Sequence, residues 1–124
     1  MKYLVRILPV NDQLEHILNI SLFDQELEVF VPYMNKDVNF GAEYLVDLEP
    51  VVLDEYIVEN TEEESNIIKI DDSLMYEIIG YLDDGKIISN NVCFDDEVLR
   101  NDFSYLNNQK VKWVIDRINL YFED

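Results

Sequence analysis

The chain has 124 residues, 48% of them hydrophobic, and its 27 Asp and Glu residues outweigh 9 Lys and Arg residues to give a net charge of −18. This length fits a single globular domain, residues 1–124, with one hydrophobic core. The apolar content argues against intrinsic disorder, and no apolar run fits a membrane span or a signal peptide. The single cysteine, Cys93, excludes an internal disulfide and predicts a reducing, cytoplasmic environment.

Alternating hydrophobic residues predict the first strands. Lys2–Leu8 alternates along its whole length and predicts a strand that Pro9 ends. Residues 14–22 fit both a helical and a strand spacing. We favour a strand, because a second alternating run, residues 27–31, follows the polar break at Asp24-Gln25. Two such runs around a short break predict a hairpin.

The middle of the chain is rich in turn residues and acids. Residues 32–41 contain proline, asparagine and glycine and predict a loop. Residues 43–48 alternate as a strand that Pro50 interrupts, and β-branched residues resume over Val51–Val58. A bent strand or two short edge strands would accommodate the proline. Glu59–Asn66 is polar and acidic, and we expect a mobile loop there.

The strongest local signal is a hairpin. Tyr76–Leu82 and Lys86–Phe94 flank Asp83-Asp84-Gly85, where glycine supplies the positive φ that a tight turn needs. Asp95-Asp96-Glu97 then predicts the start of a short helix, because aspartate caps free amide groups. Its expected buried stripe is Val98, Leu99, Phe103 and Leu106.

The chain ends on a strand signal. Asn107-Asn108 ends the helical pattern, and Val111–Phe122 predicts one long final strand with Trp113 buried in its core face. Many short strands and one short helix predict a mainly β protein, an antiparallel barrel or sandwich. The element order over residues 43–122 is similar to OB-like small barrels, although that fold places its helix between the third and fourth of five strands. This is a likeness of architecture and implies no function.

The sequence offers little for catalysis. Its one histidine, His16, lies in an apolar alternating segment, and Cys93 lies between hydrophobic strand residues, so neither predicts a nucleophile with its base. Zinc would need more Cys and His ligands, and no acidic run follows the EF-hand spacing. The glycines Gly41, Gly80 and Gly85 are too far apart for a phosphate loop. We therefore expect no enzyme activity, no metal and no cofactor.

The acid is concentrated in one stretch. Residues 37–68 contain no Lys, Arg or His. A surface with complementary charge speeds association and selects partners, so this stretch predicts a docking surface for a basic protein. Nucleic acid is disfavoured because it needs a basic patch. The predicted contact residues are Asp54, Glu55, Glu59, Glu62, Glu63 and Glu64, with Tyr44 and Tyr56 as aromatic anchors.

These observations favour a non-enzymatic, acidic protein-binding module. In composition the chain resembles small acidic antagonists, such as immunity proteins and nucleic-acid mimics, which occlude a basic surface. Two alternatives stay open: a self-associating accessory subunit whose charge only keeps it soluble, and a β-barrel that binds a small ligand or a divalent cation. The oligomeric state is left open by the sequence.

Overall fold

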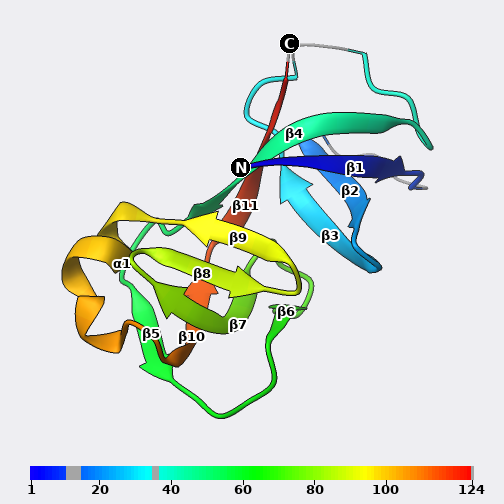
Figure 1. The fold of residues 1–124 in the computed structure, drawn as a ribbon. Helices are drawn as coiled ribbons and strands as arrows, with labels where there is room; N and C mark the ends of the chain where they lie inside the picture. Colours follow the sequence, from blue (N-terminus) through cyan, green and yellow to red (C-terminus); the bar gives the residue numbers. More distant parts are fainter. Residues whose placement is uncertain (11–14, 35–36, 124) are drawn as a thin grey trace. The chain divides into compact units, whose positions relative to one another are not determined.

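The computed structural model describes residues 1–10, 15–34 and 37–123, and these are mostly β-strand with one short α-helix (Figure 1). Backbone contacts divide the chain into two compact units. The first is formed by Met1–Glu49 with Ile118–Asp124, and the second by Pro50–Arg117. The predicted β class is confirmed. The single-domain organisation expected from the length stays a prediction.

Five strands close the first unit into a barrel in the order β1-β2-β3-β11-β4. Its strands are β1 (Lys2–Leu8), β2 (Ile17–Leu22), β3 (Gln25–Phe30), β4 (Glu43–Val51) and β11 (Arg117–Phe122). The β1 strand pairs antiparallel with β2 and β4, whereas β3 and β11 run parallel. Counted within the barrel this is the order 1-2-3-5-4, and five strands are also the number in OB-like small barrels.

The barrel therefore lies only partly in the segment where the sequence suggested an OB-like arrangement, because β4 and β11 fall within it. It uses β1 to β3, which precede residues 43–122. The described part of the connection between β3 and β4 contains no helix, unlike the standard fold. The predicted strand at Lys2–Leu8 and the β2–β3 hairpin are confirmed, with Phe23 and Asp24 at φ 48° and 63° in the turn. Residue 14 of the second predicted segment lies outside the described residues.

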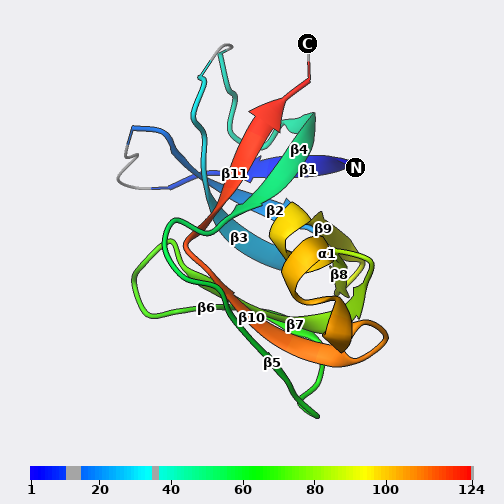
Figure 2. The same ribbon diagram turned by 90° about the vertical axis from the view of Figure 1, so that its left-hand side faces the viewer.

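The second unit is an antiparallel sheet in the order β5-β10-β7-β8-β9, with β6 also paired to β7 (Figure 2). Its strands are β5 (Ile57–Asn60), β6 (Asn66–Lys69), β7 (Tyr76–Asp83), β8 (Lys86–Ser89), β9 (Val92–Asp95) and β10 (Lys110–Ile115). The helix α1 (Glu97–Asp102) and the 3-10 turn η1 (Ser104–Leu106) lie between β9 and β10 in the chain.

Turn residues set the hairpins of this sheet. Asp84 and Gly85 have φ of 48° and 80°, so the predicted β7–β8 turn is confirmed. A single strand over Lys86–Phe94 is wrong, because Asn90 and Asn91 also adopt positive φ, 48° and 68°. Asparagine tolerates this conformation better than most residues, and the chain turns there into β9.

Two further strand predictions need correction. The β4 strand continues through Pro50 to Val51, and residues 52–56 are not strand, so most of the strand predicted at Val51–Val58 is absent. The Leu53 amide donates instead to Asp116 Oδ2, at 2.6 Å, which replaces a strand partner. The acidic loop is also shorter than Glu59–Asn66, because β5 extends to Asn60 and β6 begins at Asn66.

The final strand, expected to be continuous over Val111–Phe122, is divided at Asp116 into β10 and β11. Trp113 is fully buried in β10, as predicted. The buried hydrophobic positions are Val111, Trp113 and Ile115 before the break, and Ile118, Leu120 and Phe122 after it, with the polar Asn119 also buried. The alternation thus changes phase where the chain leaves one unit for the other.

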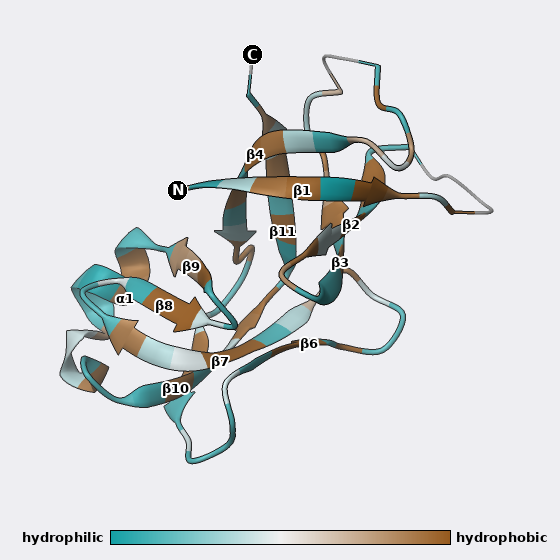
Figure 3. Ribbon diagram, turned by 45° about the vertical axis from the view of Figure 1, so that its right-hand side comes forward, coloured by the Kyte–Doolittle hydropathy of each residue, from teal (hydrophilic) through white to brown (hydrophobic). Residues whose placement is uncertain are grey.

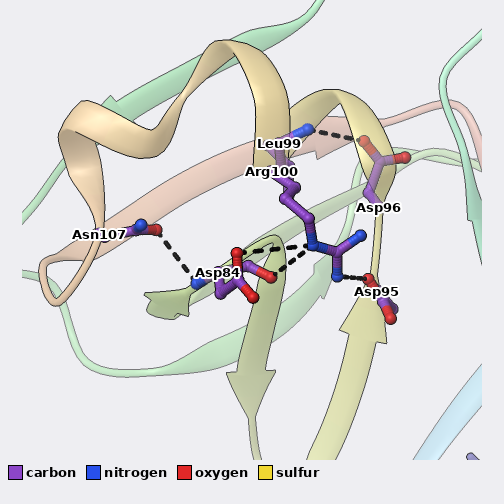
Figure 4. A network of polar contacts seen from close by, with 6 residues as sticks. All are labelled: Asp84, Asp95, Asp96, Leu99, Arg100 and Asn107. Atoms are coloured by element: carbon purple, nitrogen blue, oxygen red, sulfur yellow. Dashed lines mark hydrogen bonds and ion pairs between the residues drawn. The ribbon is translucent and has the colours of Figure 1, made fainter.

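The helix begins as predicted, with the Asp96 side chain accepting from the Leu99 amide. Of the predicted buried stripe, Leu99 and Leu106 are buried, whereas Val98 and Phe103 are only half-buried. The helix α1 ends at Asp102, and Phe103 lies between it and η1. Figure 4 shows how Arg100 fastens this region: its guanidinium donates to the Asp84 carbonyl and, at 2.6 Å, to the Asp95 carboxylate.

Candidate functional site

The two predicted aromatic anchors have structural contacts of their own. Tyr44 lies on β4 in the first unit, where its hydroxyl accepts from the Asn39 amide and its ring meets Phe122 edge-on. The six predicted carboxylates belong to the second unit. The structure therefore assigns Tyr44 to a different unit from the acids that it was expected to accompany.

Tyr56 lies within an aromatic stack of the second unit. Its ring packs on Trp113 and on Phe103, each with centroids 6.1 Å apart, and its hydroxyl donates to the Asp96 carboxylate. Burial, followed by the hydrogen bond to Asp96, raises the pKa of the phenol. Tyr56 is thus fixed by the fold, and its predicted contact with a partner stays a prediction.

The strand β5 separates the predicted carboxylates into two groups. Asp54 and Glu55 precede the strand, Glu59 lies on it, and Glu62, Glu63 and Glu64 follow it. The four residues of the strand span about 13 Å. Asp54 and Glu55 thus form a first cluster before β5, and Glu59, Glu62, Glu63 and Glu64 form a second cluster on and after it.

Part of the second cluster is neutralised. Glu63 forms an ion pair with Lys112, and the strand register places Glu59 opposite the same lysine. The Lys112 ammonium lowers the pKa of the Glu63 carboxyl, while Glu63 raises the pKa of Lys112. Folding thus brings a base from the C-terminal third to acids that the sequence shows as unopposed. Among the described residues, Glu62 and Glu64 form no ion pair.

The first cluster borders a hollow of about 220 Å³ in the second unit. It is lined by Asp54, Glu55, Ile57, Met75, Val114, Ile115 and Asp116. Asp116 is engaged by the Leu53 amide, whereas the exposed side chains of Asp54 and Glu55 have no hydrogen bond or ion pair within the described part of the chain. The hollow is smaller than the roughly 300–1,000 Å³ of a typical ligand pocket.

Sequence reasoning missed an exposed apolar face on this sheet. The register of β5, β6, β7, β8 and β10 places alternate residues of these strands on one outward face. Four large hydrophobic residues on this face are substantially exposed: Ile57 at 49%, Ile68 at 40%, Tyr81 at 56% and Ile88 at 50%. Figure 3 shows hydrophobic residues along β8 and part of β7. The sequence signal was the doublets Ile78-Ile79 and Ile87-Ile88, which place apolar side chains on both faces of a strand.

The histidine and the cysteine belong to different units. His16 precedes β2 in the first unit and hydrogen-bonds the Val31 carbonyl at 2.6 Å, whereas Cys93 is half-buried on β9 in the second. Burial is the largest cause of the raised pKa of the Cys93 thiol. Among the described residues, no group of three or more His, Cys, Asp or Glu side chains could hold a metal ion. No helix in those residues has the length and hydrophobicity needed to cross a membrane.

The fold and these surfaces define a strongly acidic β protein with a closed five-stranded barrel and a second sheet. The chain belongs to the family described as uncharacterised conserved protein UCP019853, whose model matches residues 1–123. Comparison with curated proteins and with solved structures finds no match.

Proposed function

We propose that this protein is a non-enzymatic binding module that holds a basic protein partner at the acidic ends of β5. The observation that carries the proposal is the hollow, which is lined both by the exposed carboxylates of Asp54 and Glu55 and by apolar residues that include Met75 and Val114. Lys and Arg side chains combine an aliphatic stem with a cationic head, so the apolar and acidic lining residues suit the two parts of such a side chain.

The net charge of −18 supports the antagonist form of this proposal. A strongly acidic surface attracts a basic partner over several ångströms and raises the association rate. The protein would then occlude the basic surface of its partner, as an immunity protein or a nucleic-acid mimic does. Direct binding to nucleic acid is disfavoured, because phosphates are repelled by the same charge. The half-buried thiol of Cys93 suits the reducing cytoplasm, where we place this activity.

A nona-arginine peptide tests the hollow. The double variant Asp54→Asn/Glu55→Gln should weaken binding about fivefold, the effect of removing two exposed ion pairs together worth about 1 kcal/mol. The matched control is Asp71→Asn/Asp72→Asn, which removes the same charge from exposed residues elsewhere in the second unit. Asp71 has φ 51°, a conformation that asparagine also adopts.

The comparison between the two variants decides the question. A larger loss in the Asp54/Glu55 variant supports the hollow as the contact site. Equal losses in both would show that the peptide responds to net charge only, and that the hollow is not the site. If the peptide binds neither the wild type nor the variants at low salt, the proposed function is wrong.

A further inference from the structure

The outward side of the β7–β8 hairpin carries a short strip of mixed character. Tyr81 and Asp83 on β7 pair in register with Ile88 and Lys86 on β8, respectively. All four side chains are exposed, whereas the intervening Leu82 and Ile87 are fully buried. We call these four exposed residues, Tyr81, Asp83, Lys86 and Ile88, the hairpin face.

The hairpin face differs from the rest of the acidic surface. Its one carboxylate, Asp83, lies beside its one ammonium group, Lys86. Asp95 on β9 also pairs with Lys86, and Asp95 is matched in turn by the Arg100 guanidinium, so the strip is close to neutral. Lys110 adds a further positive charge 5.4 Å above the Tyr81 ring. Large exposed apolar side chains that lie together usually mark a contact surface. Tyr81 and Ile88 lie on this nearly neutral strip, where two chains of charge −18 can approach with little local repulsion.

We propose that two copies of this chain associate through the hairpin face, across a two-fold axis that runs between β7 and β8 and parallel to them. Such an axis exchanges the two strands between copies. Tyr81 of one copy then lies over Ile88 of the other, and Asp83 lies over Lys86. Each contact occurs twice. Because Tyr81 pairs with Ile88 and Asp83 with Lys86 within one copy, the hairpin face of a second copy meets apolar residues with apolar residues and opposite charges with each other.

Self-association and binding of a basic partner should depend on salt in opposite ways. Two chains of charge −18 repel each other at long range, and the Debye length falls from about 30 Å at 0.01 M salt to about 10 Å at 0.1 M. Added salt should therefore strengthen self-association, while it weakens binding of a basic partner. The hairpin face is small, so the dimer is of the weak, reversible kind.

Sedimentation velocity over a range of protein concentrations tests the proposal, with reductant present so that Cys93 cannot cross-link. The wild type should show a monomer–dimer equilibrium that shifts toward dimer with salt. Ile88→Glu should raise the dissociation constant at least about tenfold, because it places a carboxylate in the apolar centre. The control Leu45→Glu changes net charge equally at a residue of the barrel that is 48% exposed, and should leave the dimer intact.

A charge exchange separates the geometry from general charge effects. Asp83→Lys puts two lysines together within each copy and across the axis, so the dimer should weaken. The double variant Asp83→Lys/Lys86→Asp restores both pairings at the wild-type net charge, and should restore the dissociation constant to within about threefold. Melting temperatures show that each variant is folded.

Three results would overturn the proposal. The first is a wild-type protein that sediments as a monomer up to about 1 mM. The second is a dimer that Ile88→Glu leaves intact. The third is a double charge variant that stays as weak as Asp83→Lys. None of these bears on binding of nona-arginine at the hollow, so the two proposals fail separately.

Discussion

The hydroxyl of Tyr56 donates a 2.9 Å hydrogen bond to Asp96 Oδ2, the same oxygen that accepts from the Leu99 amide at the start of α1. One carboxylate therefore both caps the helix and holds the residue that precedes β5. This contact ties the acidic segment to the helix across 40 residues of sequence. It also makes the phenol of Tyr56 difficult to ionise, since burial and Asp96 both raise its pKa.

Tyr56→Phe should cost about 1 kcal/mol at neutral pH, because it removes the hydrogen bond and keeps the ring stack. A raised pKa in the folded state means that the contribution of the neutral phenol is complete below its ordinary value of 10.0 and is lost as the pH rises above it. Urea unfolding at about pH 8 and about pH 11 should therefore show a smaller difference between wild type and variant at the higher pH. A constant difference would contradict the assigned pKa shift.

Trp113 is fully buried and stacks on Tyr56. Trp113→Ala should destabilise the fold by about 3–5 kcal/mol. Trp113→Phe should cost less, because an aromatic ring remains and the indole N–H has no hydrogen-bond partner among the described residues. Denaturant unfolding gives both values, and native fluorescence should be blue-shifted. Emission at the wavelength of exposed tryptophan would contradict the burial.

Gly80 permits the close approach of β7 and β8. A Cβ atom there would lie 2.2 Å from the Ile88 carbonyl oxygen, which is backbone and cannot rotate away. Gly80→Ala should therefore cost about 3 kcal/mol as β8 is displaced. Gly41→Ala is the comparison, because φ is +86° but nothing lies within 4 Å of the added atom, so only about 1–2 kcal/mol of backbone strain is expected. Equal melting temperatures would contradict the predicted clash.

Glutamine substitutions distinguish the roles of the exposed glutamates that follow β5. Glu62→Gln/Glu64→Gln should leave stability unchanged and slow association with nona-arginine in stopped-flow measurements, because exposed charges act mainly on the association rate. Glu63→Gln should lower the melting temperature at neutral pH, because it breaks the ion pair with Lys112.

The pH dependence of Glu63→Gln has a definite sign. The pKa of Glu63 is lowered in the folded state, so its stabilisation is present above the ordinary value of 4.5 and is lost as the pH falls through the folded value. The difference between wild type and Glu63→Gln should vanish in acid. A difference that persists in acid would mean that Glu63 acts through packing and not through charge.

Salt should stabilise the protein. At −18 the self-repulsion of the folded chain is large, and raising salt from about 0.01 M to about 0.1 M shortens its range threefold. The melting temperature should therefore rise over this interval, measured at a protein concentration low enough to keep the chain monomeric. A flat or falling melting temperature would contradict this prediction and show that self-repulsion among the acids does not limit stability.

Features that depend on adjacent residues were predictable. The Lys2–Leu8 strand, the Asp84-Gly85 turn and the Asp96 cap each follow from a few neighbouring side chains, and all three are confirmed. The phase change of the buried residues around Asp116 was also visible in the sequence, as a shift from odd to even positions. It marks the division of the final strand.

Long-range partners were not predictable from the sequence. The parallel pairing of Phe30 with Asn119 closes the barrel, and nothing local to either residue indicates it. The hollow likewise needs Asp54 beside Asp116, which β5 and β10 bring together. The acidic stretch was recognised as a charge pattern, but the ion pair of Glu63 with Lys112 depends on the same strand pairing.

The second unit interrupts the barrel between its fourth and fifth strands, and this has a consequence during synthesis. Residues 50–117 are contiguous, so this unit can fold as soon as they leave the ribosome. The barrel has to wait for β11, and until then β3 and β4 each expose an unpaired edge. Such edges recruit other chains. A nascent chain stalled before residue 118 would therefore combine a finished insert with an open, aggregation-prone half-barrel, and a chaperone that binds strand edges would act on it in that interval.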